Sequence, residues 1–205
     1  MTDQPGGPID VKDHSVPLMT DVPVTLKPYP LPFNVTEIVE KEVQNTLNMG
    51  VIEKSTSAYS LPVVLVKKPD GSIRFRINIC ALSKITVFDA EPIPDQEEMF
   101  AHLAKAKYFT KIDPTKGYQQ IPVKPEDRHK AAFQTLQGLF RWTGMPFGLV
   151  SAPATLAWMI RTLCLEENSA INFFDDNLIA TEDWDSHIQC LRQVLMKLQR
   201  FGLIA

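Results

Sequence analysis

The amino-acid sequence predicts an α+β fold. Apolar residues at helical spacing and short β-prone runs are mixed along the chain, without the regular strand–helix–strand alternation that builds a parallel sheet. The 205 residues are 44% hydrophobic and 22% charged, which is typical of a globular protein with one large domain or two small lobes.

An extended lead-in is predicted over residues 1–33, because this region holds seven of the 16 prolines and little periodicity. The first helix is predicted to start at Asn34, since Asn34 and Glu37 have the spacing of an N-cap and its reciprocal partner. Apolar residues then recur at helical spacing, and Gly50 is predicted to end the helix.

Two β-hairpins are predicted in the middle of the chain. Residues 61–66 and 73–79 are strand-like runs joined by a Pro-Asp-Gly-Ser turn, and residues 132–135 and 139–143 flank Gln137-Gly138. Turn residues between two apolar runs are typical of antiparallel pairing.

The remaining elements are predicted from their breakers and apolar stripes. Helices are expected over 95–105, after two prolines, and over 151–164, with Pro153 in the first turn. A strand is expected over 108–113, a short helical stretch from 126, a hairpin over 171–180, and a helix over 188–198 that Gly202 closes. Three tryptophans are interpreted as core or partly buried core residues: Trp142, Trp158 and Trp184.

Composition also predicts the cellular compartment and argues against disulfide and zinc sites. The three cysteines lack metal-ligand spacing, which argues for a reducing compartment and against a disulfide framework or a zinc site. The apolar runs are too short to span a bilayer, and the N-terminus does not resemble a secretory signal. The chain is therefore expected to be intracellular, in the cytoplasm or the nucleus, without a membrane partner.

A locally basic stretch lies within an otherwise acidic chain. The net charge is −3, but residues 66–84 contain five Lys or Arg side chains against one carboxylate, Asp70. A solvated hairpin face and a phosphate-binding face both explain this pattern.

Three aspartates are candidates for a metal site. Asp175 and Asp176 are adjacent at the expected tip of the 171–180 hairpin, and Asp113 ends another predicted strand. Mg²⁺ prefers oxygen ligands and usually takes one or two protein carboxylates. Because turns also favour aspartate for local hydrogen bonding, a purely structural role for the adjacent pair remains open at this point.

The chain from about residue 23 to residue 205 resembles the fingers and palm of reverse transcriptases, most closely those of Gypsy-type LTR retrotransposons. The matching stretches are LPVVLVKKPDGSIRF (61–75), YFTKIDPTKGYQQIPV (108–123), MPFGLVSAPAT (145–155) and FFDDNLIA (173–180). The resemblance implies a right-hand polymerase fold, with an antiparallel palm sheet packed on helices. It also implies that residues 34–205 form the reverse transcriptase domain, ending before the thumb.

The resemblance implies a role for each matching residue. Asp113, Asp175 and Asp176 match the catalytic, metal-binding aspartates, which would hold two Mg²⁺ ions, with Mn²⁺ as the alternative. The nucleotide-binding positions are Lys68 and Arg74 at the triphosphate, Tyr118 as the gate against a ribose 2′-hydroxyl, and Phe147 in the nucleotide pocket.

The implied function is RNA-directed DNA polymerisation by two-metal nucleotidyl transfer to a primer 3′ end. The implied partners are an RNA or DNA template–primer and deoxynucleoside triphosphates, within a larger Pol polyprotein that also carries ribonuclease H.

The chain departs from the family pattern near the expected site. Where the family usually reads RFCVDYRALNK, this chain reads RFRINICALSK, with Asn78, Cys80 and Ser83 at the changed polar positions, and Pro114 follows Asp113. The alternative interpretation is therefore a catalytically inactive retroelement remnant with a nucleic-acid-binding or structural role only.

Overall fold

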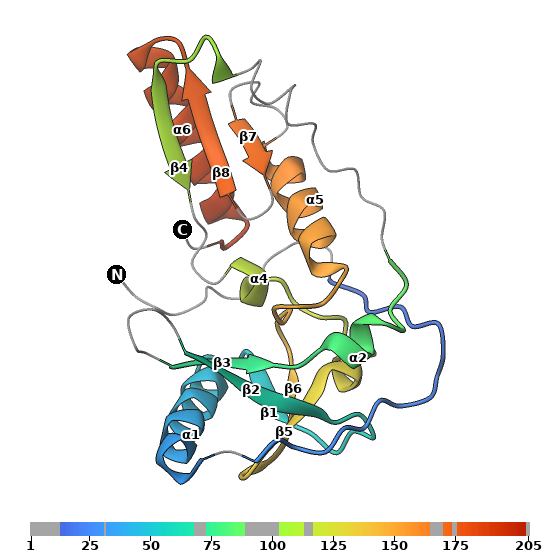
Figure 1. Ribbon diagram of the computed structural model, residues 1–205. Helices are drawn as coiled ribbons and strands as arrows, with labels where there is room; N and C mark the ends of the chain where they lie inside the picture. Colours follow the sequence, from blue (N-terminus) through green and yellow to red (C-terminus); the bar gives the residue numbers. More distant parts are fainter. Residues whose placement is uncertain are drawn as a thin grey trace. The chain divides into compact units, whose positions relative to one another are not determined.

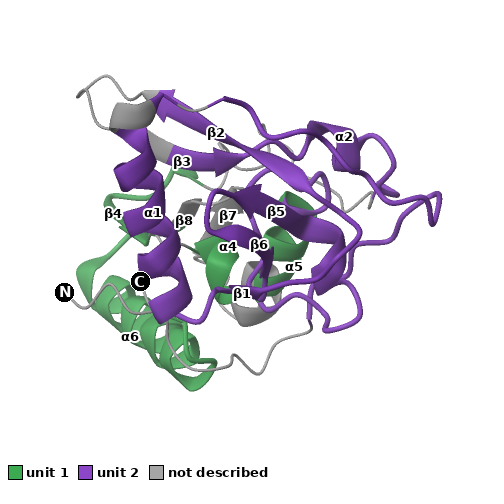
Figure 2. Cartoon of the chain, turned by 90° about the horizontal axis from the view of Figure 1, so that it is seen from below, with its two compact units in different colours: residues 1–12, 89–121, 153–205 green, residues 13–88, 122–152 purple. Residues whose placement is uncertain are grey.

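The protein is described by a computed structural model (Figure 1). The structure describes residues 13–30, 32–67, 73–88, 103–112, 117–164, 170–173 and 176–203. Within these ranges, the side chains of residues 33, 34, 67, 73, 74, 160–164, 170–173, 176 and 177 are not described. The chain divides into two compact units, unit 1 over 1–12, 89–121 and 153–205, and unit 2 over 13–88 and 122–152 (Figure 2).

A five-stranded mixed sheet forms the centre of unit 2, in the order β1-β6-β5-β2-β3. Its strands are β1 (Ile52–Lys54), β2 (Leu61–Lys67), β3 (Ile73–Ile77), β5 (Ala132–Thr135) and β6 (Gly138–Trp142). The β2–β5 pair is parallel and the other pairs are antiparallel. Both predicted hairpins, β2–β3 and β5–β6, are therefore confirmed, whereas β1 was not predicted.

Aromatic side chains fill the core of unit 2. Phe133 lies at the centre, with its ring centroid 5.8 Å from those of Phe75 and Trp142 and 5.9 Å from that of Phe140. Phe133 and Phe140 are almost fully buried. The Phe75 contact is edge-to-face and the other two are tilted, and aromatic pairs at these distances stabilise a core beyond the apolar area that they bury.

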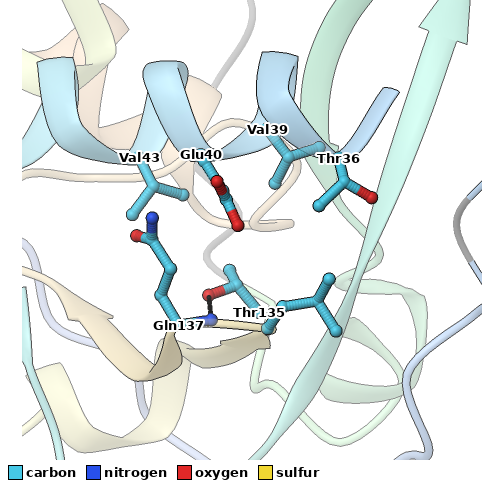
Figure 3. Close-up of a pocket in the computed structure, with 7 residues that line it drawn as sticks. Thr36, Val39, Glu40, Val43, Thr135 and Gln137 are labelled. Atoms are coloured by element: carbon cyan, nitrogen blue, oxygen red, sulfur yellow. Dashed lines mark hydrogen bonds between the residues drawn. The ribbon is translucent and has the colours of Figure 1, made fainter. Parts of the chain in front are cut away.

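Helix α1 (Phe33–Asn48) also belongs to unit 2. The predicted N-cap at Asn34 is wrong, because the helix begins at Phe33, its N-cap is Pro32, and no side chain caps it. The fixed φ of proline, here −58°, sets up helix entry without a capping side chain. Figure 3 shows Val39 and Val43 of α1 facing the β5–β6 turn, across a small pocket that Thr36, Glu40 and residues 135–137 also line.

The N-terminal segment 13–30 is extended and joins unit 2 through isolated bridges. His14 bridges to Val123, Leu18 to Thr86 and Thr25 to Ser60. Val16 is fully buried. These contacts attach the segment to several parts of unit 2 that are distant from it in the sequence.

The buried Asp127 fixes this segment through hydrogen bonds and an ion pair with the partly buried Lys130. Its carboxylate accepts hydrogen bonds from Ser15 Oγ at 3.0 Å, the Val16 backbone N–H at 2.8 Å and Lys130 Nζ at 2.5 Å. Lys130 Nζ also donates to the Val16 carbonyl at 2.8 Å. Burial alone would raise the pKa of Asp127, but these hydrogen bonds and the Lys130 charge outweigh it and hold the pKa below its ordinary value of 3.8.

Replacement of Asp127 by asparagine is expected to lower the free energy of unfolding by about 2–4 kcal/mol at pH 7, because the partly buried Lys130 loses its counter-charge and the Ser15 and Val16 donors lose a charged acceptor. Since the folded pKa of Asp127 lies below the unfolded value, its stabilisation is present above about pH 4 and is lost as the pH falls through the folded pKa. Urea unfolding at pH 7 and at acidic pH measures this.

The exposed Asp21, in the same segment, supplies the matched control. Asp21→Asn is expected to change the free energy of unfolding by less than about 0.5 kcal/mol. A difference between wild type and Asp127→Asn that stays constant down to pH 2 would contradict the assignment.

Unit 1 contains a three-stranded antiparallel sheet in the order β4-β8-β7, packed on α6. Its described elements are β4 (Tyr108–Ile112), α4 (Gly117–Gln120), α5 (Ala152–Cys164), β7 (Ala170–Phe173), β8 (Asp176–Thr181) and α6 (Trp184–Arg200). Short elements of unit 2 are α2 (Cys80–Ser83) and η1 (Arg128–Ala131). The predicted antiparallel sheet packed on a helix is confirmed. Most of the helix predicted over 95–105 lies outside the described residues.

Helix α6 has the N-cap, apolar stripe and terminator that a stable helix needs. The Asp183 carboxylate accepts a hydrogen bond from the Ser186 N–H at 2.9 Å, and Gly202 adopts a φ of 74° just beyond the helix. The core prediction for Trp184 is wrong, since this residue is 56% exposed and stacks on His187 at the start of the helix. No described helix is long and apolar enough to cross a membrane.

His187 joins α6 to the two strands β4 and β8. Its Nδ1 lies 2.9 Å from Thr181 Oγ1 and its Nε2 lies 2.8 Å from Thr110 Oγ1. Because Thr181 donates its hydroxyl hydrogen to the Asp183 carbonyl, Nδ1–H of His187 donates to Thr181, and Nε2 shares its hydrogen bond with the Thr110 hydroxyl. A buried polar side chain is thus satisfied at both nitrogens.

We expect His187→Ala to lower the free energy of unfolding by about 2–4 kcal/mol, from lost packing and from hydroxyl groups left without a partner. His187→Phe keeps a ring beside Trp184 and should give an intermediate loss. Urea unfolding followed by circular dichroism measures both, with exposed Gln189→Ala on the same helix as the control. A His187→Phe variant as stable as the wild type would show that the two hydrogen bonds contribute nothing.

Candidate functional site

The strand pair β4–β8 brings together the chain segments that carry the predicted aspartates. Ile112, the residue before Asp113, is paired with Asn177, the residue after Asp176. This pairing is the last of five in an antiparallel register that begins with Tyr108 and Thr181. Ile112 is buried, so the end of β4 is anchored in the packed sheet.

The β7–β8 hairpin supplies the second part of this arrangement. Phe173 is paired with Asp176, and only Phe174 and Asp175 separate these two positions in the sequence. Asp176 is therefore the first residue of β8, as the predicted hairpin with acidic residues at its tip requires.

Asp113 and Asp175 lie outside the described residues, and only the backbone of Asp176 is described. Among the side chains that the structure describes, no group of three His, Cys, Asp or Glu residues could hold a metal ion. The three predicted ligands thus remain a prediction, and the β4–β8 register is the structural fact that bears on them.

The β2–β3 hairpin carries the predicted triphosphate contacts. Arg74 lies in β3 opposite Val66 of β2, and Lys68 follows the last residue of β2 and lies outside the described residues. Val66 is 47% exposed, so this part of the hairpin has a solvent-facing side. A solvent-facing β-hairpin with lysine and arginine can present cations to a phosphate.

Tyr118 lies in the short helix α4 of unit 1 and is buried. Its carbonyl accepts a hydrogen bond from the Ile121 N–H at 3.2 Å, and Ile121 is itself fully buried. The ring is therefore more enclosed than a half-buried surface aromatic, and its position is restricted by packing.

Phe147 lies in the loop between β6 and α5 and is 36% exposed. On either side of it, Met145 and Leu149 are buried. Gly148 adopts a φ of 97°, and its carbonyl accepts a hydrogen bond from Ser83 Oγ at 3.3 Å. The loop is thus fixed on both sides of an exposed ring, a conformation that glycine permits and other residues strain.

Sequence reasoning missed Arg76, whose guanidinium carbon lies 4.9 Å from the centre of the Phe147 ring. The two residues are far apart in the sequence, and the only early signal was the basic character of the 66–84 stretch.

Asn78, one of the departures from the family pattern, has a structural role here. Its Nδ2 donates to the Tyr29 hydroxyl at 3.0 Å and its Oδ1 accepts from the Cys80 N–H at 3.1 Å.

Two pockets among the described residues are unrelated to these positions. One lies between α1 and the β5–β6 turn, and the other lies along α6 between Ile188 and Gln199. Neither lining contains Arg74, Tyr118 or Phe147. The candidate positions are therefore described within each unit: Tyr118 and the β4–β8 strand ends in unit 1, and the β2–β3 hairpin and the Phe147 loop in unit 2.

Comparison with known proteins identifies the family. Residues 66–205 match the family model described as "Reverse transcriptase (RNA-dependent DNA polymerase)". The Pol polyprotein of transposon opus from Drosophila melanogaster is 37% identical over 191 residues, covering 90% of this chain and 19% of that protein. The Tf2-3 polyprotein of Schizosaccharomyces pombe is 31% identical over 181 residues, covering 87% of this chain and 14% of that protein.

Solved structures agree on the fold. The native protease–reverse transcriptase of prototype foamy virus superposes with a TM-score of 0.89 at 24% identity, over 98% of this chain and 27% of that protein. The foamy viral enzyme in complex with an RNA/DNA hybrid gives the same TM-score at 23% identity, with the same coverage. The right-hand polymerase fold is confirmed, and the chain spans about a fifth or less of the curated relatives named above. The family model covers more than half of the 205 residues, and the chain belongs to the reverse transcriptase (RNA-dependent DNA polymerase) family.

Proposed function

We propose that the chain catalyses RNA-directed DNA synthesis, by two-metal nucleotidyl transfer to the 3′ end of a primer. The observation that carries the proposal is the β4–β8 register, in which the neighbours of Asp113 and Asp176 are directly paired. Carboxylates from two adjacent strand ends are the arrangement that a two-metal phosphoryl-transfer site needs.

Asp113, Asp175 and Asp176 are the proposed ligands for the metal. The reverse transcriptase family generally uses divalent metal ions, and the donor set proposed here is made only of carboxylate oxygens, which suits Mg²⁺, with Mn²⁺ as the alternative. When bound, two such ions would stabilise the charge on the attacking and leaving oxygens. The protein's own contribution is to hold the carboxylates on a rigid sheet, so that their geometry is set before substrate binds.

Four side chains are proposed to bind the incoming deoxynucleoside triphosphate. Lys68 and Arg74 contact its phosphates, the first as a point charge and the second as a fork of donors. Tyr118 excludes a ribose 2′-hydroxyl by its volume, and Phe147 lines the pocket. The burial of Tyr118 supports this role, because a ring that selects by steric exclusion must be unable to move aside.

The proposed partners are an RNA or DNA template–primer and deoxynucleoside triphosphates. We further propose that residues 34–205 act as the polymerase domain of a larger, intracellular Pol polyprotein, with residues 1–33 as its lead-in and with ribonuclease H elsewhere in the product. Similarity to the Pol polyproteins of opus and Tf2-3 supports the larger product.

Primer extension on an RNA template with Mg²⁺ and deoxynucleotides tests the proposal. Extension should occur with Mg²⁺, stop when the metal is chelated, and resume when it is restored. The alternative is an inactive remnant that binds nucleic acid without extending a primer. Filter binding of template–primer at several salt concentrations detects such binding, because phosphate contacts give salt-dependent affinity. A folded chain that binds template–primer but never extends the primer would support the inactive remnant.

A further inference from the structure

Arg76 and Phe147 form a cation–π pair on the surface of unit 2. The guanidinium carbon of Arg76 lies 4.9 Å from the ring centre of Phe147, within the range where a cation is attracted to the face of an aromatic ring. The ring is 36% exposed, so the pair leaves part of the phenylalanine surface accessible to a ligand.

The strand register places this pair on the side of the β2–β3 hairpin that faces away from the core. Arg74 and Arg76 are paired with Val66 and Val64, and residues two apart in a strand belong to the same face. Phe75 belongs to the opposite face and packs on Phe133 of the core at 5.8 Å. Positions 74 and 76 of β3 therefore belong to the same strand face, and Arg76 lies on the side opposite Phe75.

The backbone beside Phe147 is fixed on the Gly148 side. Leu149 is buried and the Gly148 carbonyl is bonded to Ser83. A planar guanidinium restricts a ring better than a compact ammonium does, because it stacks as well as attracts. Arg76 thus restricts the orientation of an exposed aromatic side chain.

We propose that Arg76 is a positioning residue, whose guanidinium holds the Phe147 ring in the orientation that contacts the incoming deoxynucleotide. This inference rests on the proposed function, in which Phe147 lines the nucleotide pocket. The two arginines of β3 then have different tasks. Arg74 contacts the triphosphate, and Arg76 acts through Phe147 without contacting the nucleotide.

Steady-state primer extension tests whether Arg76 acts through Phe147 rather than on the nucleotide directly. The four variants are Arg76→Met, Arg76→Lys, Phe147→Leu and the Arg76→Met/Phe147→Leu double variant. Arg76→Met is expected to raise the KM for the deoxynucleotide about three- to fivefold, the effect of losing one exposed cation–π pair, with kcat within about twofold. Arg76→Lys keeps the charge but not the stacking and should fall between wild type and Arg76→Met.

The double variant separates positioning from direct contact. In the Phe147→Leu background, Arg76→Met should raise KM no further, because the two residues act as one unit. The salt dependence of nucleotide KM should be the same in wild type and in Arg76→Met. Independent effects of the two substitutions, or a reduced salt dependence in Arg76→Met, would show that Arg76 contacts phosphate directly and would overturn the proposal.

A second measurement does not depend on polymerase activity. In NMR spectra, the Arg76 side-chain Hδ signals should be shifted upfield by the Phe147 ring in the wild type and not in Phe147→Leu. If the wild type fails to extend a primer, the proposed function fails. Titration of wild type and Arg76→Met with magnesium deoxythymidine triphosphate then tests whether the Arg76–Phe147 pair contributes to nucleotide affinity. Binding at least about threefold weaker in Arg76→Met supports it, whereas no upfield shift, unchanged binding or no binding at all overturns it.

Circular dichroism of every variant shows whether it folds. If Arg76→Met does not fold, Arg76→Lys carries the comparison with Phe147→Leu. A KM for Arg76→Lys equal to that of the wild type would then mean that a positive charge alone is sufficient for nucleotide binding. That result would overturn the proposal that the planar guanidinium holds the Phe147 ring.

Discussion

Asp175→Asn is expected to lower the rate of primer extension by on the order of 10³-fold or more, because removal of one carboxylate charge weakens a two-metal site that supplies several kcal/mol of transition-state stabilisation. Affinity for template–primer should change little, since its phosphates bind to lysine and arginine. Single-turnover extension and filter binding measure the two quantities separately.

Asp185→Asn is the matched control for this experiment. Asp185 lies exposed in the first turn of α6 and has no proposed role, so its amide variant should extend primers like the wild type. Asp113→Asn should lose activity as Asp175→Asn does, and Asp176→Asn should lose less, as the family pattern implies. Extension that survives Asp175→Asn would remove this residue from the metal site.

Tyr118→Val is expected to reduce discrimination against ribonucleotides by roughly 10²-fold, since a smaller side chain no longer excludes the 2′-hydroxyl. The measured quantity is kcat/KM for a deoxynucleotide divided by kcat/KM for the matching ribonucleotide. The loss should come mainly from improved use of the ribonucleotide rather than from poorer use of the deoxynucleotide.

Tyr118→Phe controls for the size of the ring. Because it keeps the ring and removes only the hydroxyl, its selectivity should stay close to that of the wild type. A Tyr118→Val variant that folds, extends primers and discriminates as strongly as the wild type would show that Tyr118 is only a buried packing residue.

Local patterns in the sequence were sufficient to predict most elements of the fold. The sequences between β2 and β3 and between β5 and β6 contain glycine between apolar runs, and helix α6 has an apolar stripe with Gly202 beyond its end. These signals act within a few residues, so they can be recognised without knowledge of the tertiary structure.

Long-range pairings explain what was missed. Strand β1 has only three residues and pairs with β6 through contacts such as Glu53 with Arg141, whose Nε donates to the Glu53 carboxylate at 2.7 Å. The parallel β2–β5 pair also joins distant segments. Helix α1 begins after Pro32 and not at the N-cap pattern of Asn34. One capping hydrogen bond contributes only about 1 kcal/mol, which other interactions can outweigh.

The candidate site was predicted from motifs rather than from periodicity. Residue spacing alone left the adjacent pair Asp175 and Asp176 open to a turn interpretation. The β4–β8 register adds physical support, because it joins the neighbours of Asp113 and Asp176 across one strand pair. The Arg76–Phe147 contact was not predictable, since it depends on how a loop folds back over a distant strand.

Paramagnetic relaxation by Mn²⁺ tests most directly whether the metal site lies at this end of the sheet. Mn²⁺ accepts the same carboxylate ligands as Mg²⁺, and it broadens NMR signals of nuclei near the bound ion. Substoichiometric Mn²⁺ should broaden the backbone amide signals of Ile112 and Asn177 first, and excess Mg²⁺ should restore them. Broadening that spares these two residues, or that persists unchanged in Asp113→Asn and Asp175→Asn, would contradict a carboxylate metal site at the β4–β8 strand ends.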